Sequence, residues 1–184
     1  MENIGERLVG DYLGVIQGCD FVTFNLHTPD VQGEIDVVGI NTAARKLFIC
    51  EVVTHMVTGM MYVHPVTKQP DNVARFLRKF EKNIAYARNR FPDHQHIFML
   101  WSPIVRQSGE RAKHDQMRDL AEIGQKLRET FDITLQLVCN QDFLKCVNEL
   151  RQYAATETRE LKSPVLRLFQ IEEKLKRHLG GMES

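Results

Sequence analysis

Two neighbouring apolar segments in the first third of the chain constrain its fold most strongly. They run over residues 34–40 and 46–53, and both are rich in valine and isoleucine. Such segments are typical of strands that are covered on both faces. Only residues 41–45 separate them, so the two strands are expected to form an antiparallel hairpin.

This hairpin would bring one acidic residue of each strand together. A turn centred between Ala43 and Ala44 pairs apolar residues with each other and then acid with acid: Ile40 with Leu47, Val38 with Ile49, and Asp36 with Glu51. Opposed residues of an antiparallel pair point to the same side of the sheet. Two ionised carboxylates in an apolar setting repel each other and lose hydration, which a hard cation such as Mg²⁺ can offset. The alternative is that both acids lie at the rim of the sheet, solvated or paired with Arg or Lys.

The remaining pattern predicts one α/β domain with a mixed sheet and helices on both faces. Its 184 residues suffice for a single hydrophobic core. We expect a domain over residues 1–155 and a C-terminal helix within 156–184. The elements expected around the hairpin are helices at about 3–17, 72–90, 110–130 and 141–154, strands at 21–26, 96–101 and 133–139, and an irregular loop at 54–71.

The last helix is expected to begin at Pro164, with Ser163 as its N-cap. Five aliphatic residues follow one face of it: Leu161, Val165, Leu168, Leu175 and Leu179. This face either packs on the domain or forms a seam between two copies of the chain.

Composition and charge exclude several classes of protein. No apolar run approaches the ~18 residues of a membrane span, and residues 1–6 lack the features of a signal peptide, so a cytoplasmic location without membrane contact is expected. The four cysteines form no Cys-x-x-Cys pair, which argues against a disulfide framework or a zinc cage. With 24 basic and 24 acidic residues, the chain is not suited to coating nucleic acid non-specifically, although a local basic groove is compatible with it.

Three segments carry a family resemblance. Gly5-Glu6 opens a helix, Gly33-Glu34-Ile35-Asp36-Val37-Val38-Gly39 forms the first hairpin strand, and Phe48-Ile49-Cys50-Glu51-Val52-Val53-Thr54 forms the second. Together they resemble the PD-(D/E)XK nuclease superfamily, and most closely the branch of archaeal Holliday-junction resolvases, Mrr-like restriction enzymes and YraN-like bacterial proteins. The close resemblance covers about the first 55 residues and implies a restriction-endonuclease-like fold.

The resemblance also implies a chemistry. Asp36 and Glu51 would ligate Mg²⁺ or Mn²⁺, and the backbone carbonyl of Val52 would complete the site. Glu6 would support it from an outer shell or at a second metal ion, although a Glu at the edge of an apolar stripe can also be simply solvated. The implied activity is that of an endonuclease, a metal-dependent hydrolase of phosphodiester bonds that binds nucleic acid, with DNA favoured.

One position departs from the family pattern. The family lysine stands two residues after the glutamate, and here that residue is Val53. A lysine can reach in from elsewhere, with Lys68, Lys79 and Lys82 as candidates, or His55 can act as the base. The third explanation is an inactive site in a module that binds nucleic acid or a protein partner.

The helix expected at 72–90 carries many basic residues, including Arg75, Arg78 and Lys82, against the single acid Glu81. These three side chains are candidates for phosphate contacts beside the active site. The alternative is an ordinary amphipathic helix with a solvated basic face.

Overall fold

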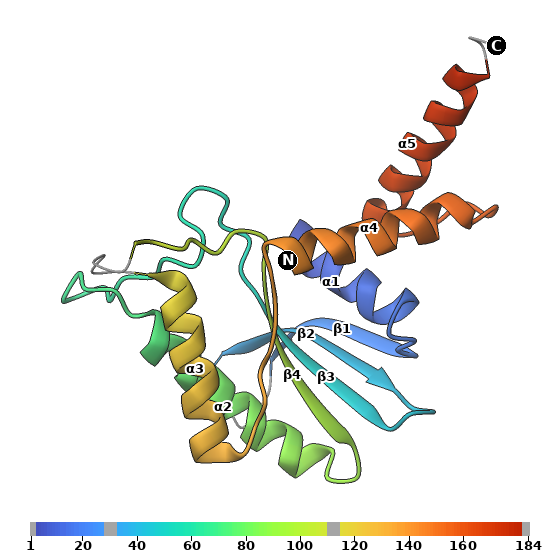
Figure 1. Ribbon diagram of the computed structural model, residues 1–184. Coiled ribbons are helices and arrows are strands. Elements are labelled where there is room, and N and C mark those ends of the chain that lie inside the picture. The colour runs from blue at the N-terminus through green and yellow to red at the C-terminus, as the bar shows by residue number, and fades with distance from the viewer. Residues whose placement is uncertain (1–2, 28–32, 110–114, 182–184) are drawn as a thin grey trace.

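The computed structural model describes residues 3–27, 33–109 and 115–181, and over these residues the chain is an α/β protein with one mixed sheet (Figure 1). The order of elements expected from the sequence is confirmed. It is α1 (Ile4–Val15), β1 (Phe21–His27), β2 (Glu34–Asn41), β3 (Lys46–Val52), α2 (Asn72–Arg90), β4 (Gln95–Ser102), α3 (Gln116–Phe131), β5 (Gln136–Cys139), α4 (Gln141–Thr156) and α5 (Pro164–Gly180).

The five strands lie in the sheet in the order of the sequence, β1 to β5. β1 pairs antiparallel with β2, and β2 pairs antiparallel with β3, whereas β4 pairs parallel with β3 and β5 pairs parallel with β4. The predicted hairpin register is confirmed, because Ile40 pairs with Leu47 and Val38 with Ile49. The Asn41 side chain accepts a 2.8 Å hydrogen bond from the Ala44 amide and so fixes the turn that sets this register.

Helices cover both faces of the sheet, as expected. On one face, α1 and α4 bury Val9, Leu13 and Leu150 with the strand residues Phe48 and Cys50. On the other face, α2 and α3 form a separate core in which Phe76, Phe80 and Ile123 pack with Ile49 and Phe98. The alternation of side chains along β3 assigns Phe48 and Cys50 to the first core and Ile49 to the second.

Three predicted boundaries differ from the structure. α1 ends at Val15, and Gly18 follows with a positive φ of 66°. The helix predicted from about residue 110 is α3, which begins at Gln116, while residues 110–114 lie outside the described part of the chain. The strand predicted from Ile133 begins only at Gln136, because Asp132 adopts a left-handed conformation and the Ile133 amide still bonds to Leu127 to close α3.

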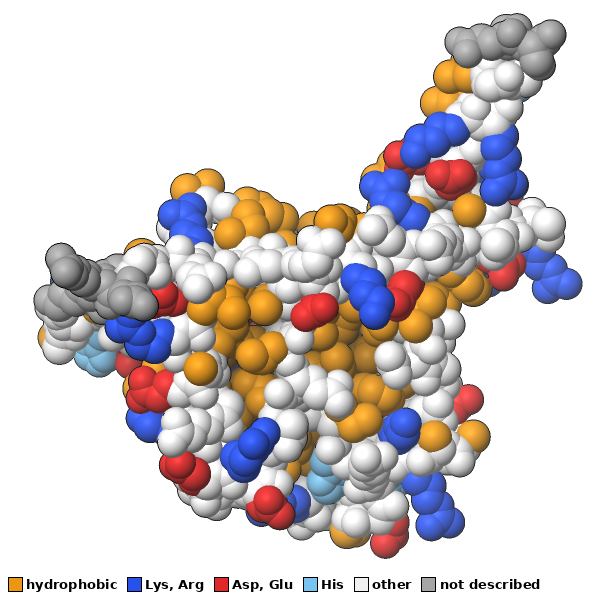
Figure 2. Space-filling view, in the orientation of Figure 1, with side chains coloured by type: hydrophobic (Ala, Val, Ile, Leu, Met, Phe, Trp, Pro, Cys, Tyr) orange, Lys and Arg blue, Asp and Glu red, His pale blue; other side chains and the backbone are white. Residues whose placement is uncertain are grey.

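The aliphatic face predicted for the last helix is only partly covered by the described chain. Val165, Leu166 and Phe169 are buried, but Leu168 and Leu175 are exposed. Figure 1 and, in space-filling form, Figure 2 show α5 projecting away from the sheet, and residues Lys174 to Gly180 are exposed, although the Arg177 guanidinium donates a 3.0 Å hydrogen bond to the Ala155 carbonyl of α4.

No described helix is both long and apolar enough to cross a membrane. All four cysteines are free, and three of them are buried.

Candidate functional site

The hairpin places two acids on the face that α2 covers. The observed pairing ends at Val37 with Cys50, and its next step sets Asp36 opposite Glu51. Asp36 is largely buried, and Glu51 is fully buried at 0% exposure. Asp36 Oδ2 accepts a 2.7 Å hydrogen bond from the Val52 amide, which ties the carboxylate of β2 to the end of β3.

A lysine from α2 lies against both acids. Lys79 Nζ is 3.3 Å from Asp36 Oδ1 and forms an ion pair with Glu51 Oε2. One helical turn later, Asn83 Nδ2 donates a 2.7 Å hydrogen bond to Glu51 Oε1. The spacing of four residues puts the amine and the amide on the same side of the helix, so α2 supplies a cation and a donor to one carboxylate pair.

Burial and charge set the protonation of this cluster. Burial, reinforced by the charge of Asp36, raises the pKa of Glu51 to about 8, although Lys79 and Asn83 act in the opposite direction. Burial opposes the charge on Lys79, but Glu51 and Asp36 outweigh it and raise the pKa of the amine above its usual value. Burial therefore favours the protonated form of the Glu51 carboxyl, and the single Lys79 amine does not fully balance the charges of two ionised acids.

The donor set is suited to a small hard cation. Asp36 and Glu51 offer carboxylate oxygens beside the main chain of Val52, and Mg²⁺ or Mn²⁺ prefers such oxygens together with water. Burial is the main cause of the raised pKa of Glu51, but the negative charge of Asp36 contributes to it, and that charge favours a cation between the two carboxylates. No group of three or more His, Cys, Asp or Glu residues is gathered anywhere in residues 3–27, 33–109 and 115–181, so water or substrate oxygens would have to complete the coordination.

Val53 lies where the family pattern has lysine, and its side chain is part of the apolar core beneath α2. Its amide bonds to the carbonyl of Trp101 on β4 at 2.8 Å, which keeps the backbone in the sheet. Lys79, one of the three alternative lysines considered from the sequence, is the one that the structure brings to the carboxylates.

Glu6 is buried at the start of α1, where it closes a capping box with Asn3. Its Oε2 also accepts a 3.1 Å hydrogen bond from Asn25 of β1. These contacts account for the carboxylate of Glu6, and the described residues gather no third acid around Asp36 and Glu51. Glu6 therefore organises the end of α1 in this structure.

His55 and Arg75 of α2 both contact Tyr62, which lies in the loop before α2. The rings of His55 and Tyr62 lie 5.5 Å apart, and the Arg75 guanidinium is 4.2 Å from the centre of the Tyr62 ring. Burial raises the pKa of Tyr62, with Arg75 and Lys79 opposing the shift and the two acids adding to it. Tyr62 thus links the loop to the charged cluster.

The other basic candidates lie at the surface. Arg78 forms a 2.9 Å ion pair with Asp71, and the side chains of Lys82 and Lys68 are exposed. The apolar residues of the same loop divide between core and solvent, because Met60 is buried while Met56 is exposed.

Asn83 is the site residue that the sequence analysis did not identify. The sequence pattern that could have identified it is a polar residue on the apolar side of an amphipathic helix. Asn83 lies four positions after Lys79 and beside the buried residues Phe80 and Ile84. A buried amide requires a polar partner, so this position could have pointed to the carboxylates.

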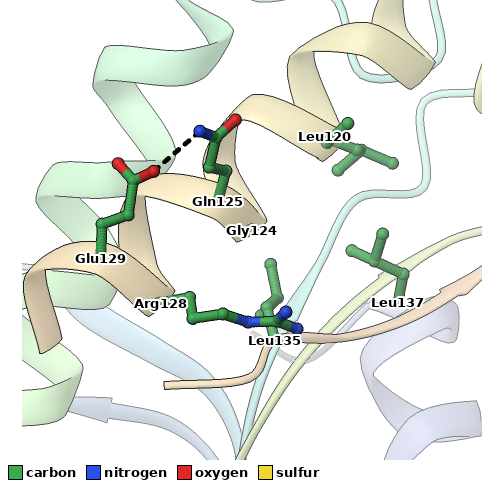
Figure 3. Close-up of a pocket in the computed structure, with 8 residues that line it drawn as sticks. Leu120, Gly124, Gln125, Arg128, Glu129, Leu135 and Leu137 are labelled. Atoms are coloured by element: carbon green, nitrogen blue, oxygen red, sulfur yellow. Dashed lines mark hydrogen bonds between the residues drawn. The ribbon is translucent and has the colours of Figure 1, made fainter. Parts of the chain in front are cut away.

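A separate groove of about 340 Å³ lies between α3 and β5 (Figure 3). Leu120, Leu135 and Leu137 form its apolar walls, and Arg128 reaches across it. It contains none of the carboxylate, lysine or amide groups of the cluster, so it is not the candidate site.

Comparisons with models of known protein families, with curated proteins and with solved structures each found no match for this chain. The class of protein is therefore defined by the fold and the site alone: an α/β protein with a buried Asp–Glu–Lys cluster at the edge of its hairpin.

Proposed function

We propose that the protein is a divalent-metal-dependent endonuclease of the restriction-endonuclease-like fold, acting on nucleic acid and preferentially on DNA. The observation that carries the proposal is the contact of Lys79 with both Asp36 and Glu51. Lys79, which lies on α2, supplies the cationic group that Val53 cannot provide.

Each member of the cluster has a role in this proposal. Asp36 and Glu51 would hold Mg²⁺ or Mn²⁺ beside the Val52 main chain, and the bound ion would polarise a phosphate oxygen and acidify a water molecule. Lys79 would stabilise the negative charge that develops on the phosphate, because its amine is held in a largely buried site where charge interactions are strong. Asn83 would orient Glu51 through its hydrogen bond.

Basic side chains near the cluster support nucleic acid as the substrate. Arg75 and Arg78 lie on the same helix as Lys79, and Lys82 is exposed a turn further along it. They would contact backbone phosphates and position the strand without reading its sequence. The neutral net charge of the chain is compatible with a basic surface of this limited size.

A second candidate function is an inactive module that has kept the nuclease architecture to bind nucleic acid or a protein partner. It is favoured by one arrangement: Val53 fills the family lysine position with apolar packing, and Lys79 and Asn83 already pair with the acids. A module without metal would show this internal pairing.

A cleavage assay separates the two candidates. Linear, branched and single-stranded DNA and an RNA would each be incubated with the protein in Mg²⁺, in Mn²⁺ and in chelator. We expect metal-dependent cleavage that Lys79→Met lowers by about a hundredfold or more, while Lys126→Met, at an exposed lysine of α3, retains wild-type activity. Full cleavage by Lys79→Met would contradict the role of Lys79, and no cleavage of any substrate would favour the inactive module.

A further inference from the structure

Each carboxylate of the cluster has one oxygen held by a neutral donor and one oxygen held by Lys79. Asp36 Oδ2 accepts the hydrogen bond of the Val52 amide, and Glu51 Oε1 accepts that of Asn83. The other two oxygens, Asp36 Oδ1 and Glu51 Oε2, both face the Lys79 amine, which is 3.3 Å from Asp36 Oδ1. Lys79 therefore bridges the pair through the two oxygens that are otherwise open to a bound cation.

Glu51 Oε2 is the least satisfied oxygen of the four. It is buried and accepts no hydrogen bond within the described residues, where it contacts Lys79 as an ion pair. A buried carboxylate oxygen has lost the hydration that would stabilise its charge, and a single amine replaces only part of it. A divalent ion carries twice the charge of the amine, so this oxygen is suited to a stronger cationic partner than lysine.

The amine and a metal ion cannot both hold these two oxygens. Mg²⁺ lies about 2.0–2.1 Å from each oxygen that ligates it, and the Lys79 amine already lies 3.3 Å from Asp36 Oδ1. An ion bound to both oxygens would be close to the amine, and like charges at such a separation repel strongly in a buried site. Metal binding by Asp36 Oδ1 and Glu51 Oε2 thus requires Lys79 to leave them.

Lys79 is able to move, whereas the neutral donors are fixed. Its side chain is 31% exposed, while Asn83 is only 4% exposed and the Val52 amide is part of β3. Lysine carries its amine on a flexible four-carbon stem, so the amine can turn toward solvent without a shift of α2. Its departure leaves the hydrogen bonds to Asp36 Oδ2 and Glu51 Oε1 in place, and these keep both carboxylates in position.

We propose that Lys79 competes with the metal ion for Asp36 Oδ1 and Glu51 Oε2 and thereby regulates metal loading of the site. This inference rests on the proposed function, because that function assigns a metal ion to the pair. A phosphate of the substrate offers Lys79 another anionic partner, and a lysine drawn to that phosphate frees the two oxygens. The site consequently loads metal most readily together with nucleic acid, and each ligand favours the binding of the other.

The neighbouring cation Arg78 provides a matched control for this competition. It precedes Lys79 in the same helix and carries the same charge, but its 2.9 Å ion pair is with Asp71. Loss of Arg78 removes one positive charge near the site without freeing the two oxygens. A comparison of the two positions therefore separates direct competition from a general change in charge.

The first test is the affinity of the full chain for Mn²⁺, measured by calorimetric titration without nucleic acid. Lys79→Met should bind Mn²⁺ roughly tenfold more tightly or better, because the apparent affinity rises with the fraction of sites that are accessible. Arg78→Met should match the wild type. The gain of metal affinity in Lys79→Met is opposite in direction to the loss of cleavage expected for the same variant.

The outcomes distinguish this inference from the proposed function. Equal or weaker Mn²⁺ binding by Lys79→Met, beside saturable binding by the wild type, would overturn the competition and leave the metal site intact. An equal gain in Arg78→Met and Lys79→Met would also overturn it, because charge alone would then be the cause. No binding by any of the three proteins would contradict both the competition and the metal-dependent function.

The second test is the reactivity of the Lys79 amine in the wild-type protein. The chain would be treated briefly with an amine-acylating ester, with and without saturating Mn²⁺, and the acylation of each lysine measured by mass spectrometry. Mn²⁺ should raise the acylation of Lys79 severalfold, whereas Lys126, which pairs with Glu122 on α3, should react equally in both conditions. Unchanged acylation of Lys79 would show that the amine stays on the carboxylates and would overturn the proposal.

Discussion

At the scale of single residues, the central feature is a buried glutamate whose negative charge is not fully balanced by nearby cations and hydrogen-bond donors. Glu51 is ionised in the unfolded chain above its ordinary pKa of 4.5, but in the folded protein its pKa is raised to about 8 by burial and by Asp36. Between these values the folded state holds a proton that the unfolded state has released. The free energy of unfolding contributed by Glu51 is therefore greatest at low pH and is lost as the pH rises from about 4.5 through about 8.

This pH dependence of the free energy of unfolding leads to a prediction for the stability of Glu51→Gln. In chelator, the melting temperature of the wild type should fall relative to that of the variant as the pH rises from 5 to 8.5, by an amount equivalent to roughly 1–3 kcal/mol. Lys79 does not titrate in this range, because its raised pKa lies above its ordinary value of 10.5. Parallel melting curves at both pH values would mean that Glu51 is ionised throughout.

At the scale of the elements, the position of the cluster depends on how α1 meets the end of β3. A side chain at Gly5 would overlap Thr54 Cγ2, so the first turn of α1 lies directly on the residue that follows Val53. Glu6 and Asn3 cap this same turn. The glycine therefore sets the close approach of the helix to the strand that carries Glu51.

We predict that Gly5→Ala destabilises the protein by about 1–3 kcal/mol through overpacking. Thr54→Ser removes the methyl group that the new side chain would meet, and should recover most of this loss in the double variant. Gly14→Ala is the matched control in the same helix, because nothing lies within 4 Å of a Cβ there, and it should be neutral or stabilising by up to about 1 kcal/mol. The measurement is urea unfolding, and an equal loss from Gly5→Ala and Gly14→Ala would exclude packing against Thr54 as the cause.

The features that could be predicted from the sequence are those set within one element or between two adjacent ones. The hairpin register followed from the short turn and from matching apolar residues, which are local properties, and it placed Asp36 opposite Glu51. The choice of Lys79 over Lys68 and Lys82 could not be made, because it depends on how α2 is rotated over the sheet. For α5, periodicity aligned Leu168, Leu175 and Leu179 with the buried Val165, but periodicity alone does not distinguish residues that pack on the domain from residues that stay exposed.

At the scale of the whole molecule, the proposed function requires a chain with no net charge to bind a polyanionic substrate. Positive charge near the cluster is limited and partly engaged, since Arg75 lies on Tyr62 and Arg78 pairs with Asp71. The contribution of phosphate contacts should accordingly be modest and local. Affinity for nucleic acid is expected to depend on these few cations and not on the net charge.

We therefore predict that Arg75→Ala and Arg78→Ala weaken binding to duplex DNA of any sequence. Each should reduce the slope of log affinity against log salt concentration by about one. Arg159→Ala, at an exposed arginine between α4 and α5, is the control and should leave the slope unchanged. The measurement is fluorescence anisotropy of labelled DNA over a salt series, and identical slopes for all four proteins would exclude α2 as the phosphate-binding element.

The measurement that tests the central claim most directly is calorimetric titration of metal-free protein with Mn²⁺ and Mg²⁺. We predict saturable binding at pH 7 by the wild type, with release of a proton as Glu51 ionises. Asp36→Ala and Glu51→Ala should each abolish it, and Asp142→Ala, at an exposed acid of α4, should not. Binding that survives in both site variants, or no binding by the wild type at millimolar metal, would contradict a metal site at the Asp36–Glu51 pair.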